Sequence, residues 1–387
     1  MKVFKNAMLS AAFGVSVLVF LPGNTFAFGE EEMSEGFVSD LLERLGADGE
    51  YDPDKTIDFS FLPGPFYSPD KEFGLALVAV GAYQPGAYDP NTQLSSLVIT
   101  SLASTNGSYG LEVSNKSFLN SDRQRLYFDV EIANEARDYY GIGYHQNRSG
   151  GNQTSIDIQL FHVTPMFMQR VARDTYLGFG YDFNYQKAKG VEESGTDLDL
   201  SELMSSGTSS GLTMLLSHDS RDMVTNAHRG RLVQLEGSLY RKDLGSDSNF
   251  EVVRAEYSDY QRVGQGDDVV AWQAFGRFTM GDVPWYQLST AGGSDHLRAY
   301  QQSRYRDKHF VMAQAEYRYN PAGRHGLVAW AGAGAIAPSL DEFHADEILP
   351  TAGVGYRFEV KPRMNLRLDL GFGDGESGFY FNINEAF

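Results

Sequence analysis

Apolar and polar residues alternate strictly along much of this chain, in segments of strand length. Within 311–319, valine, alanine and tyrosine occupy the odd positions, whereas methionine, glutamine, glutamate and arginine occupy the even ones. Leucines at 366, 368 and 370 likewise alternate with Asn365, Arg367 and Asp369. Because successive side chains of a strand point to opposite faces, each segment predicts a strand with one apolar and one charged face. Unpaired charges are too costly for the core of a sandwich, so the pattern favours a barrel with lipid outside and a wet lumen inside.

The alternation recurs in about sixteen segments, an even number, as single-chain bacterial barrels require. We therefore predict an all-β fold, a transmembrane antiparallel β-barrel of about 16 strands. The predicted strands lie near 73–83, 94–103, 108–118, 124–134, 139–146, 154–170, 174–187, 208–218, 230–242, 250–262, 268–280, 308–320, 325–337, 347–360, 363–373 and 377–386. Short connections predict turns on the periplasmic side, at 105–107, 264–266 and 320–323. Longer connections predict outer loops, near 188–207, 281–307 and 338–346.

The first 27 residues have the features of a secretory signal peptide. Lys2 and Lys5 precede an apolar run, and the small residues Thr25 and Ala27 suit cleavage after Ala27. A membrane anchor is the alternative, but the apolar run is shorter than a typical bilayer-spanning helix. Together with the barrel pattern, the signal predicts the outer membrane of a Gram-negative bacterium as the location.

An acidic extension, 28–66, lies between the signal peptide and the predicted barrel at 67–387. Ser34 is placed to cap a short helix, which Gly46 and Gly49 are expected to end. The apolar face of this helix has helical spacing and consists of Phe37, Leu41, Leu42 and Leu45. The helix lies either on the periplasmic rim or in the lumen as a plug, and its acidic flanks favour the rim.

Composition and charge exclude several classes of site and partner. The formal net charge is −19, and removal of the two signal-peptide lysines makes the mature chain more acidic, which argues against nucleic acid. The chain has no cysteine, which excludes a disulfide framework and a thiolate site. A soluble all-β protein shares this composition, but its strands average only about 5–6 residues. The expected surroundings are outer-membrane lipid and lipopolysaccharide.

Four sets of residues, in this order along the chain, resemble motifs of the BamA/TamA superfamily, whose barrels carry the bacterial surface antigen domain. The run 66–74 resembles the start of the family's first strand, and 218–222 with Gly230 resembles its middle hairpins. The family's sixth extracellular loop carries a glycine pair and an arginine–glycine–aromatic tip. Gly292 and Gly293 resemble the pair, and the tip is resembled by Leu297, Arg298, Ala299 and Tyr300. The runs 367–369 and 379–387 resemble its last two strands. The resemblance covers 66–387 and implies a member without the family's periplasmic client-binding domains.

The resemblance implies that the loop at 281–307 folds into the lumen and is held there by Arg298. In many members an aspartate on a nearby strand helps to hold this arginine. Here Gly332 stands at that position, and Ala299 replaces the usual loop glycine. A guanidinium group binds carboxylate bidentately and keeps its charge. The candidate partners in the lumen are therefore carboxylates on the polar faces of neighbouring strands: Glu316, Glu359 and Asp369. Asp369 is slightly preferred. An ordinary solvated loop arginine is the alternative.

The run from Ser217 to Ser220 contains every residue type of a hydrolytic triad. Adjacent strand residues point to opposite faces, so these four cannot converge. A triad built with a distant histidine stays open, with His228, His296 and His309 as the candidates. The turn residues predict an ion-pair cluster instead, formed by Asp219, Arg221 and Asp222. The acidic loops match no dedicated calcium loop, so we expect no metal. We also expect no enzyme activity and no cofactor.

Two classes of function remain. The resemblance implies insertion or translocation of protein or lipid at the outer membrane, through a weakly paired seam between the strands at 73–83 and 377–386. An unsatisfied strand edge can template an incoming strand. The alternative is a passive pore or a structural barrel without a client. The first class implies a polypeptide client or a periplasmic accessory protein as partner.

The final strand carries a further expectation that the resemblance implies. In the family, a terminal aromatic residue belongs to a signal that the barrel-assembly machinery reads during biogenesis. The residues that would form this signal here are Phe379, Phe381 and the terminal Phe387, on a strand whose outward parity is Phe379, Phe381 and Ile383. The barrel-assembly machinery is therefore a further expected partner.

Overall fold

The computed structural model describes residues 42–68, 71–90, 92–191, 198, 200, 201, 203, 206–264, 266–321 and 323–387. The predicted signal peptide and most of the predicted N-terminal helix lie outside these ranges, and within them residues 42–44 are helical. In the part of the chain that the structure describes, no helix is long and apolar enough to cross a membrane.

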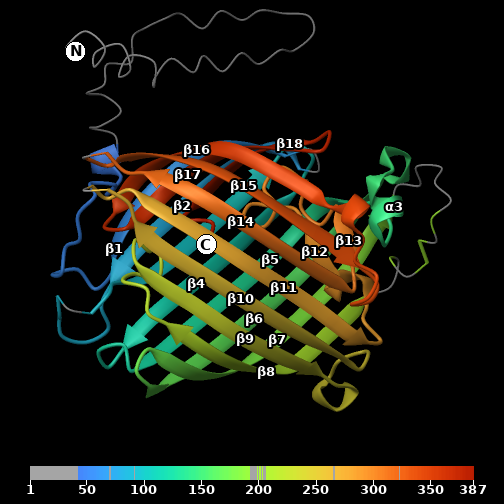
Figure 1. Ribbon diagram of the computed structural model, residues 1–387, viewed down its shortest axis with the longest axis horizontal. Helices are drawn as coiled ribbons and strands as arrows, with labels where there is room; N and C mark the ends of the chain where they lie inside the picture. The colour runs from blue at the N-terminus through green and yellow to red at the C-terminus, as the bar shows by residue number, and fades with distance from the viewer. Residues whose placement is uncertain are drawn as a thin grey trace, which may run out of the picture. The chain divides into compact units, whose positions relative to one another are not determined.

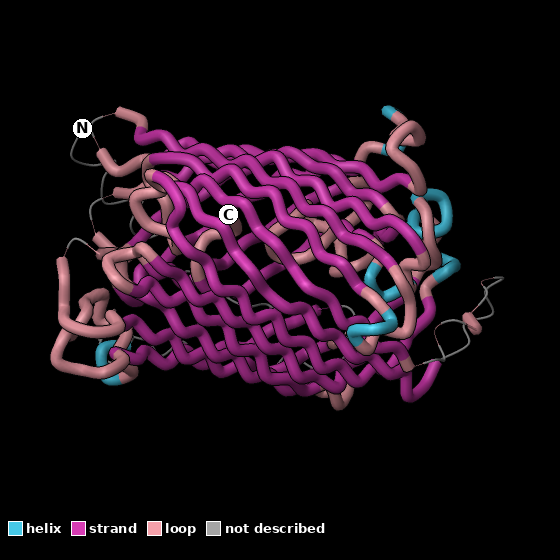
Figure 2. Tube along the Cα trace, turned by 90° about the horizontal axis from the view of Figure 1, so that it is seen from below, coloured by secondary structure: helices cyan, strands magenta, loops and turns pink. Residues whose placement is uncertain are grey.

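Sixteen antiparallel strands form one sheet that curls into a barrel, as predicted (Figures 1 and 2). Each strand pairs with its neighbour in sequence, except that β11 pairs with β14 because the short β12 and β13 form a separate pair. The strands are β1 (Asp58–Ser68), β2 (Glu72–Tyr83), β3 (Ser95–Ser104), β4 (Tyr109–Leu119), β5 (Gln124–Tyr139), β6 (Thr154–Ala172), β7 (Thr175–Val191), β8 (Gly207–Asp219), β9 (Gly230–Tyr240), β10 (Phe250–Arg262), β11 (Val269–Gly281), β14 (His309–Tyr319), β15 (His325–Ala337), β16 (Leu349–Lys361), β17 (Met364–Gly373) and β18 (Ser377–Ile383).

One predicted strand does not form and one observed strand was not predicted, so the total of sixteen strands is unchanged. The segment 139–146 is not a strand, because Gly141 and Gly143 adopt positive φ and the helix α3 (Tyr144–Arg148) begins there. Residues 58–66, predicted to belong to the extension, instead form most of β1, which pairs along its whole length with β2. Its prolines interrupt the alternation, yet they are tolerated because β1 is an edge strand. The barrel therefore begins at residue 58, and the predicted first strand at 73–83 is the second.

The strand order decides which connections share an end of the barrel. The connections 263–268 and 320–324 lie at the end where β1 begins, whereas 282–308 and 338–348 lie at the other. The turn at 105–108 lies at the long-loop end, so its predicted periplasmic place is wrong. The false strand at 139–146 had inverted the direction of every strand before it. Long loops mark the extracellular end of bacterial barrels, so we call the opposite end periplasmic.

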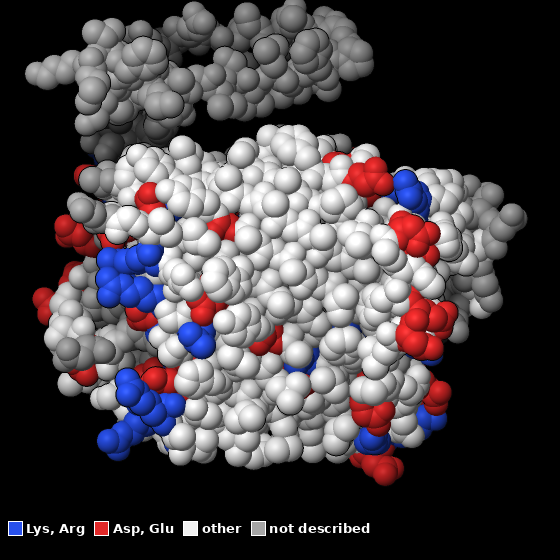
Figure 3. Space-filling model, viewed as in Figure 1, with Lys and Arg blue, Asp and Glu red and all other residues white. Residues whose placement is uncertain are grey.

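The outer wall is apolar between two charged ends. Alternate residues of β8 are exposed leucine or methionine, whereas Thr213, Leu215 and Ser217 between them are buried. Charged side chains gather towards the two ends of the barrel, and the band between them is almost uncharged (Figure 3). This belt has the chemistry of a hydrocarbon-facing surface, and the inward positions face the lumen.

The two faces of β9 give the first testable prediction. Leu235→Arg places a charge in the apolar belt, where Leu235 is 55% exposed, and should destabilise the barrel by roughly 2–4 kcal/mol. Gln234→Arg is the matched control on the neighbouring lumenal position and should cost much less. Urea titration of the protein in lipid vesicles measures both, and equal losses would contradict the assignment of faces.

Candidate functional site

The connection 282–308 folds into the lumen and lies against the inner wall of the barrel. It contains η3 (Trp285–Gln287) and the pair β12 (Ser289–Ala291) and β13 (Tyr305–Asp307). Gly292 and Gly293 both have positive φ, and a Cβ added to Gly292 would collide with the carbonyl of Gln301. The amide of Gly293 donates to the carbonyl of Tyr300 at 3.1 Å. The glycine pair therefore lets the loop turn on itself and present residues 294–300 as a tip.

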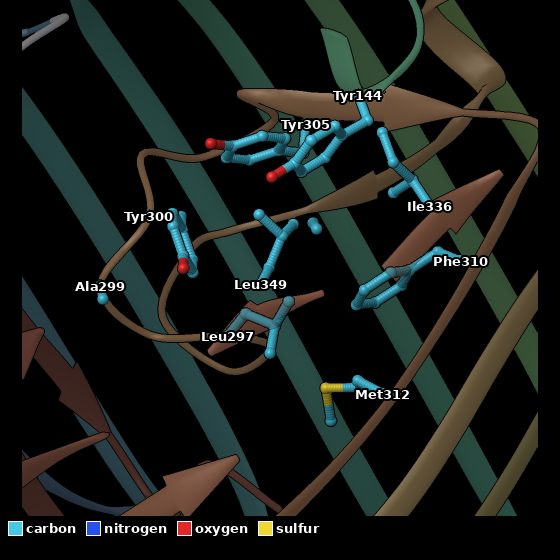
Figure 4. Packing of buried hydrophobic residues seen from close by; sticks show 10 residues of the cluster. Tyr144, Leu297, Ala299, Tyr300, Tyr305, Phe310, Met312, Ile336 and Leu349 are labelled. Atoms are coloured by element: carbon cyan, nitrogen blue, oxygen red, sulfur yellow. The ribbon is translucent and has the colours of Figure 1, made fainter. Parts of the chain in front are cut away.

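Apolar side chains dock this tip onto the wall. Leu297 and Tyr300 are fully buried among residues of β14, β15 and β16, which include Phe310, Ile336 and Leu349 (Figure 4). The Tyr300 hydroxyl also donates to the carbonyl of Pro350 at 2.7 Å. Burial of two large side chains contributes several kcal/mol to holding the tip in place.

Arg298 lies at the centre of the tip and is fully buried. Its Nη1 donates to Asp369 Oδ2 at 2.8 Å, and its Nη2 forms an ion pair with the carboxylate of Glu316. The guanidinium also stacks on Trp330, with its carbon 3.9 Å from the ring centre. Two of the three candidate carboxylates thus meet Arg298. Glu359 does not, since its carboxylate accepts the backbone N–H of Arg363 at 3.1 Å near the periplasmic end.

The carboxylates that hold the loop arginine also bind further arginines. Glu316 accepts a bond from Arg318 Nε at 2.9 Å, and Asp369 accepts one from Arg357 Nη1 at 2.6 Å. Arg357 then reaches Glu385 at 2.7 Å. Positive and negative groups therefore alternate through the lumen, which offsets the cost of burying each charge.

Two departures from the family pattern have a structural explanation. A Cβ at Gly332 would lie 2.8 Å from the Cβ of Gln314, so this position has little room for a carboxylate, and Glu316 and Asp369 take its place. Ala299 has a φ of 153°, a conformation that favours glycine, so the alanine stores strain. Its amide donates to the Tyr380 hydroxyl at 3.1 Å, which ties the tip to β18.

The two edges of the sheet, β1 and β18, overlap instead of pairing. Within the described residues, the hydrogen-bonded order of the sheet runs from β1 to β18 and no ladder joins these two strands. Phe381 and Ile383, of outward parity on β18, pack against lumenal residues of β1 and β2, among them Leu62 and Val80. A Cβ at Gly64 would lie 3.0 Å from the Phe381 ring. The edge of β18 therefore lies on the lumenal side of β1, and the predicted seam with 73–83 is wrong because β1 precedes that strand.

The end of the sequence turns into the lumen. Strand β18 ends at Ile383, and Asn384 has a φ of 68°. The Phe387 ring packs near Tyr260, with centroids 6.2 Å apart, and the C label of Figures 1 and 2 falls within the outline of the barrel. The prediction of a strand through 386 is therefore wrong. Continued alternation would point the Glu385 carboxylate at lipid, and the turn brings it to Arg357 instead. Phe379 does face outward and is exposed.

The predicted turn cluster separates into two parts. Asp219 binds Arg221 at 2.8 Å and also binds Arg125 of β5, a partner that sequence spacing could not reveal. Asp222 instead binds Arg363 at 3.1 Å and accepts the backbone N–H of His228 at 2.9 Å. The connection 220–229 is thereby joined to the turn between β16 and β17.

The residues of a hydrolytic triad do not converge in the run 217–220. Ser217 is buried on the lumenal face and accepts a bond from Gln234, whereas the His218 ring meets the Thr175 hydroxyl at 3.2 Å. Asp219 is engaged by its arginines. The alternation of a strand thus separates the serine from the histidine.

Comparisons with known proteins agree with this architecture. The family model of the Omp85 superfamily domain matches residues 95–387. The fold is similar to BamA from Haemophilus ducreyi lacking POTRA domains 1–3, at 13% identity and a TM-score of 0.52, over 90% of this chain and 77% of that one. It is also similar to CdiB from Escherichia coli, at 9% identity and a TM-score of 0.54, over 86% of this chain and 62% of that one, which is less than two thirds of its length. No curated protein matches the sequence.

The contacts of Arg298 generate the second prediction. Arg298→Ala leaves Glu316 and Asp369 without a buried cation on the loop and should destabilise the barrel by about 3–5 kcal/mol. Protease sensitivity of the connection 282–308 should rise in parallel. Arg148→Ala is the control, since its pair with Asp374 is exposed. Unchanged protease sensitivity in Arg298→Ala would show that the loop does not depend on this residue.

A third prediction concerns pH. Burial and the nearby Arg363 lower the pKa of His228 from 6.5 to about 4. Because the folded state disfavours the protonated ring, this contribution to stability is complete above pH 6.5 and is lost as the pH falls towards 4. His228→Gln should therefore flatten the fall in unfolding free energy over this interval. Parallel pH profiles for the variant and the wild type would contradict the assignment.

Proposed function

Because this chain belongs to the Omp85 superfamily, we propose that it inserts or translocates polypeptide at the outer membrane, with the overlapped seam between β1 and β18 as the route. Barrels of this superfamily reside in the outer membrane, and the apolar belt of this one suits that location. The proposal extends to a Gram-negative outer membrane, with lipid and lipopolysaccharide around the wall.

The observation that carries the proposal is the missing ladder at the seam. A closed barrel satisfies every strand edge, whereas here the sheet ends on β1 and β18 without mutual pairing among the described residues. Gly64 lies at the overlap, where its lack of a side chain leaves room for Phe381. An incoming strand can therefore pair with an edge of the sheet without first breaking a ladder there.

Partners follow from the same proposal. The client is an extended polypeptide that adds to a strand edge, captured directly or through a periplasmic accessory protein. Phe379, Phe381 and Phe387 remain candidates for the signal that the barrel-assembly machinery reads. The anchoring role of Arg298 serves this function by fixing the loop that contacts β18. No catalytic step is assigned to the chain.

A passive pore is the second candidate, and one observation favours it. The lumen contains a cavity of about 1410 Å³ lined by many charged and polar residues, among them Glu112, Lys116, Asp129 and Arg254. Such a cavity suits water and small polar solutes. The folded-in loop and the inward tail both line it, which argues against a wide open channel.

The fourth prediction separates these two candidates. A photo-crosslinking residue in place of Phe66 on β1 should capture polypeptide in cells, because Phe66 lies beside the seam. The same residue in place of Leu235, on the apolar belt of β9, is the control. A short bis-maleimide crosslink between Gly64→Cys and Phe381→Cys, whose positions face each other across the overlap, should abolish capture, and the absence of native cysteines makes this pair unambiguous.

Two results would contradict the seam route. Capture at position 66 that does not exceed the Leu235 control, or that persists in the locked barrel, would argue against a seam route. Solute conductance of the purified barrel in planar bilayers, unaffected by the crosslink, would then support the passive pore.

A further inference from the structure

The segment 42–57, which precedes β1, contacts both sides of the overlapped seam at the periplasmic end. On one side, the amide of Phe61 on β1 donates to the carbonyl of Leu45 at 2.7 Å. On the other, the amide of Gly49 donates to the carbonyl of Val360 on β16 at 3.2 Å. The segment thus satisfies one group of the otherwise unpaired β1 edge and reaches beyond β17 and β18 to the next strand.

A buried lysine joins the same elements through charge. Lys361, the last residue of β16, is fully buried, and its Nζ lies 2.7 Å from Asp58 Oδ2 and 2.9 Å from Asp48 Oδ1. Asp58 is the first residue of β1 and is itself buried, whereas the side chain of Asp48 is 43% exposed. Through this one ammonium group, β16 on the C-terminal side of the seam is joined to the first strand and to the segment that precedes it.

Packing around the lysine excludes water. Ala47, Val360 and Met364 are fully buried together in the cluster that also contains Phe381. Arg324 donates to the carbonyl of Ala47 and so fixes the segment from the turn between β14 and β15. An ammonium group in such surroundings needs a carboxylate partner, because an unpaired buried charge costs several kcal/mol, and the buried Asp58 is the partner that opening of the seam would remove.

We propose that residues 42–58 form a latch that holds the seam closed at the periplasmic end, with Lys361 as the group that fastens it. Parting β1 from β18 separates Asp58 from Lys361, so the seam opens only when this buried pair is broken. The exposed Asp48 arm is the accessible side of the latch and is released first. Its release by an incoming polypeptide rests on the proposed function, whereas the latch itself is a property of the closed barrel.

Thiol labelling of the purified protein tests the latch without any client. Leu62 is 3% exposed beneath the overlap, and the chain has no native cysteine, so Leu62→Cys reports opening of the seam. Adding Lys361→Met should raise the rate of maleimide labelling at this cysteine on the order of ten-fold. Lys55→Met is the matched control: Lys55 also binds Asp58, at 2.8 Å, but is 53% exposed, so the rate should change less than about two-fold.

Two further variants keep the test decisive. Leu232→Cys, equally buried on the wall at β9, should label slowly in both backgrounds, and a matching rise there would show general loosening and overturn the latch. Asp48→Asn removes only the exposed arm and should give an intermediate rise at position 62. This variant decides the matter if Lys361→Met fails to assemble, and an unchanged rate in it would then overturn the proposal. Failed client capture with an intact latch would reject only the proposed function.

Discussion

Arg298 is one of several buried cations in the lumen, and it is the one that fixes the folded-in loop to the barrel through the two wall carboxylates that neutralise it. A guanidinium group stays charged at any relevant pH, so a fully buried arginine requires paired carboxylates. The cation is on the loop and the anions are on β14 and β17, so satisfying the charge also fixes the loop against the wall. The loop in turn positions β18, because the Tyr380 hydroxyl bridges the amide of Ala299 and the carbonyl of Tyr300. The geometry of the seam therefore follows from an ion pair deep in the lumen.

Among the described residues, two kinds of contact join the two ends of the sheet and a third fixes β18 to the loop; none of them is a hydrogen-bonded ladder. Towards the extracellular end, the loop tip holds β18 through Tyr380. In the overlap, Phe381 packs on the lumenal face of β1 and β2. At the periplasmic end, Lys361 joins β16 to Asp58 and to the segment before it. Contacts of this sort keep the seam closed at rest and are separable one after another, which suits a barrel that opens.

Alternation along the strands predicted the fold class, because in a barrel every strand has one lipid face and one wet face. It failed where other constraints override alternation. Prolines interrupt β1, and Gly141 with Gly143 ends a segment that otherwise has the pattern of a strand. Parity also pointed to Glu316 and Asp369 as inward groups. Parity does not reveal how far along the barrel axis a residue lies, so Glu359, near the periplasmic end beside a bulge, was also a candidate. The inward turn at Asn384 and the pairing of Lys361 with residues 303 and 313 positions away arise from tertiary contacts alone.

In the resting barrel, Arg298 fixes the loop tip inside the lumen. Amide hydrogen exchange of the wild-type protein tests whether the tip is held in this way. The amides of Gly293, Ala299 and Tyr300 donate to groups in or around the tip, so they should exchange far more slowly than those of the exposed connection 338–348. Exchange of the tip amides as fast as that of this exposed connection would show that Arg298 does not hold the loop against the wall.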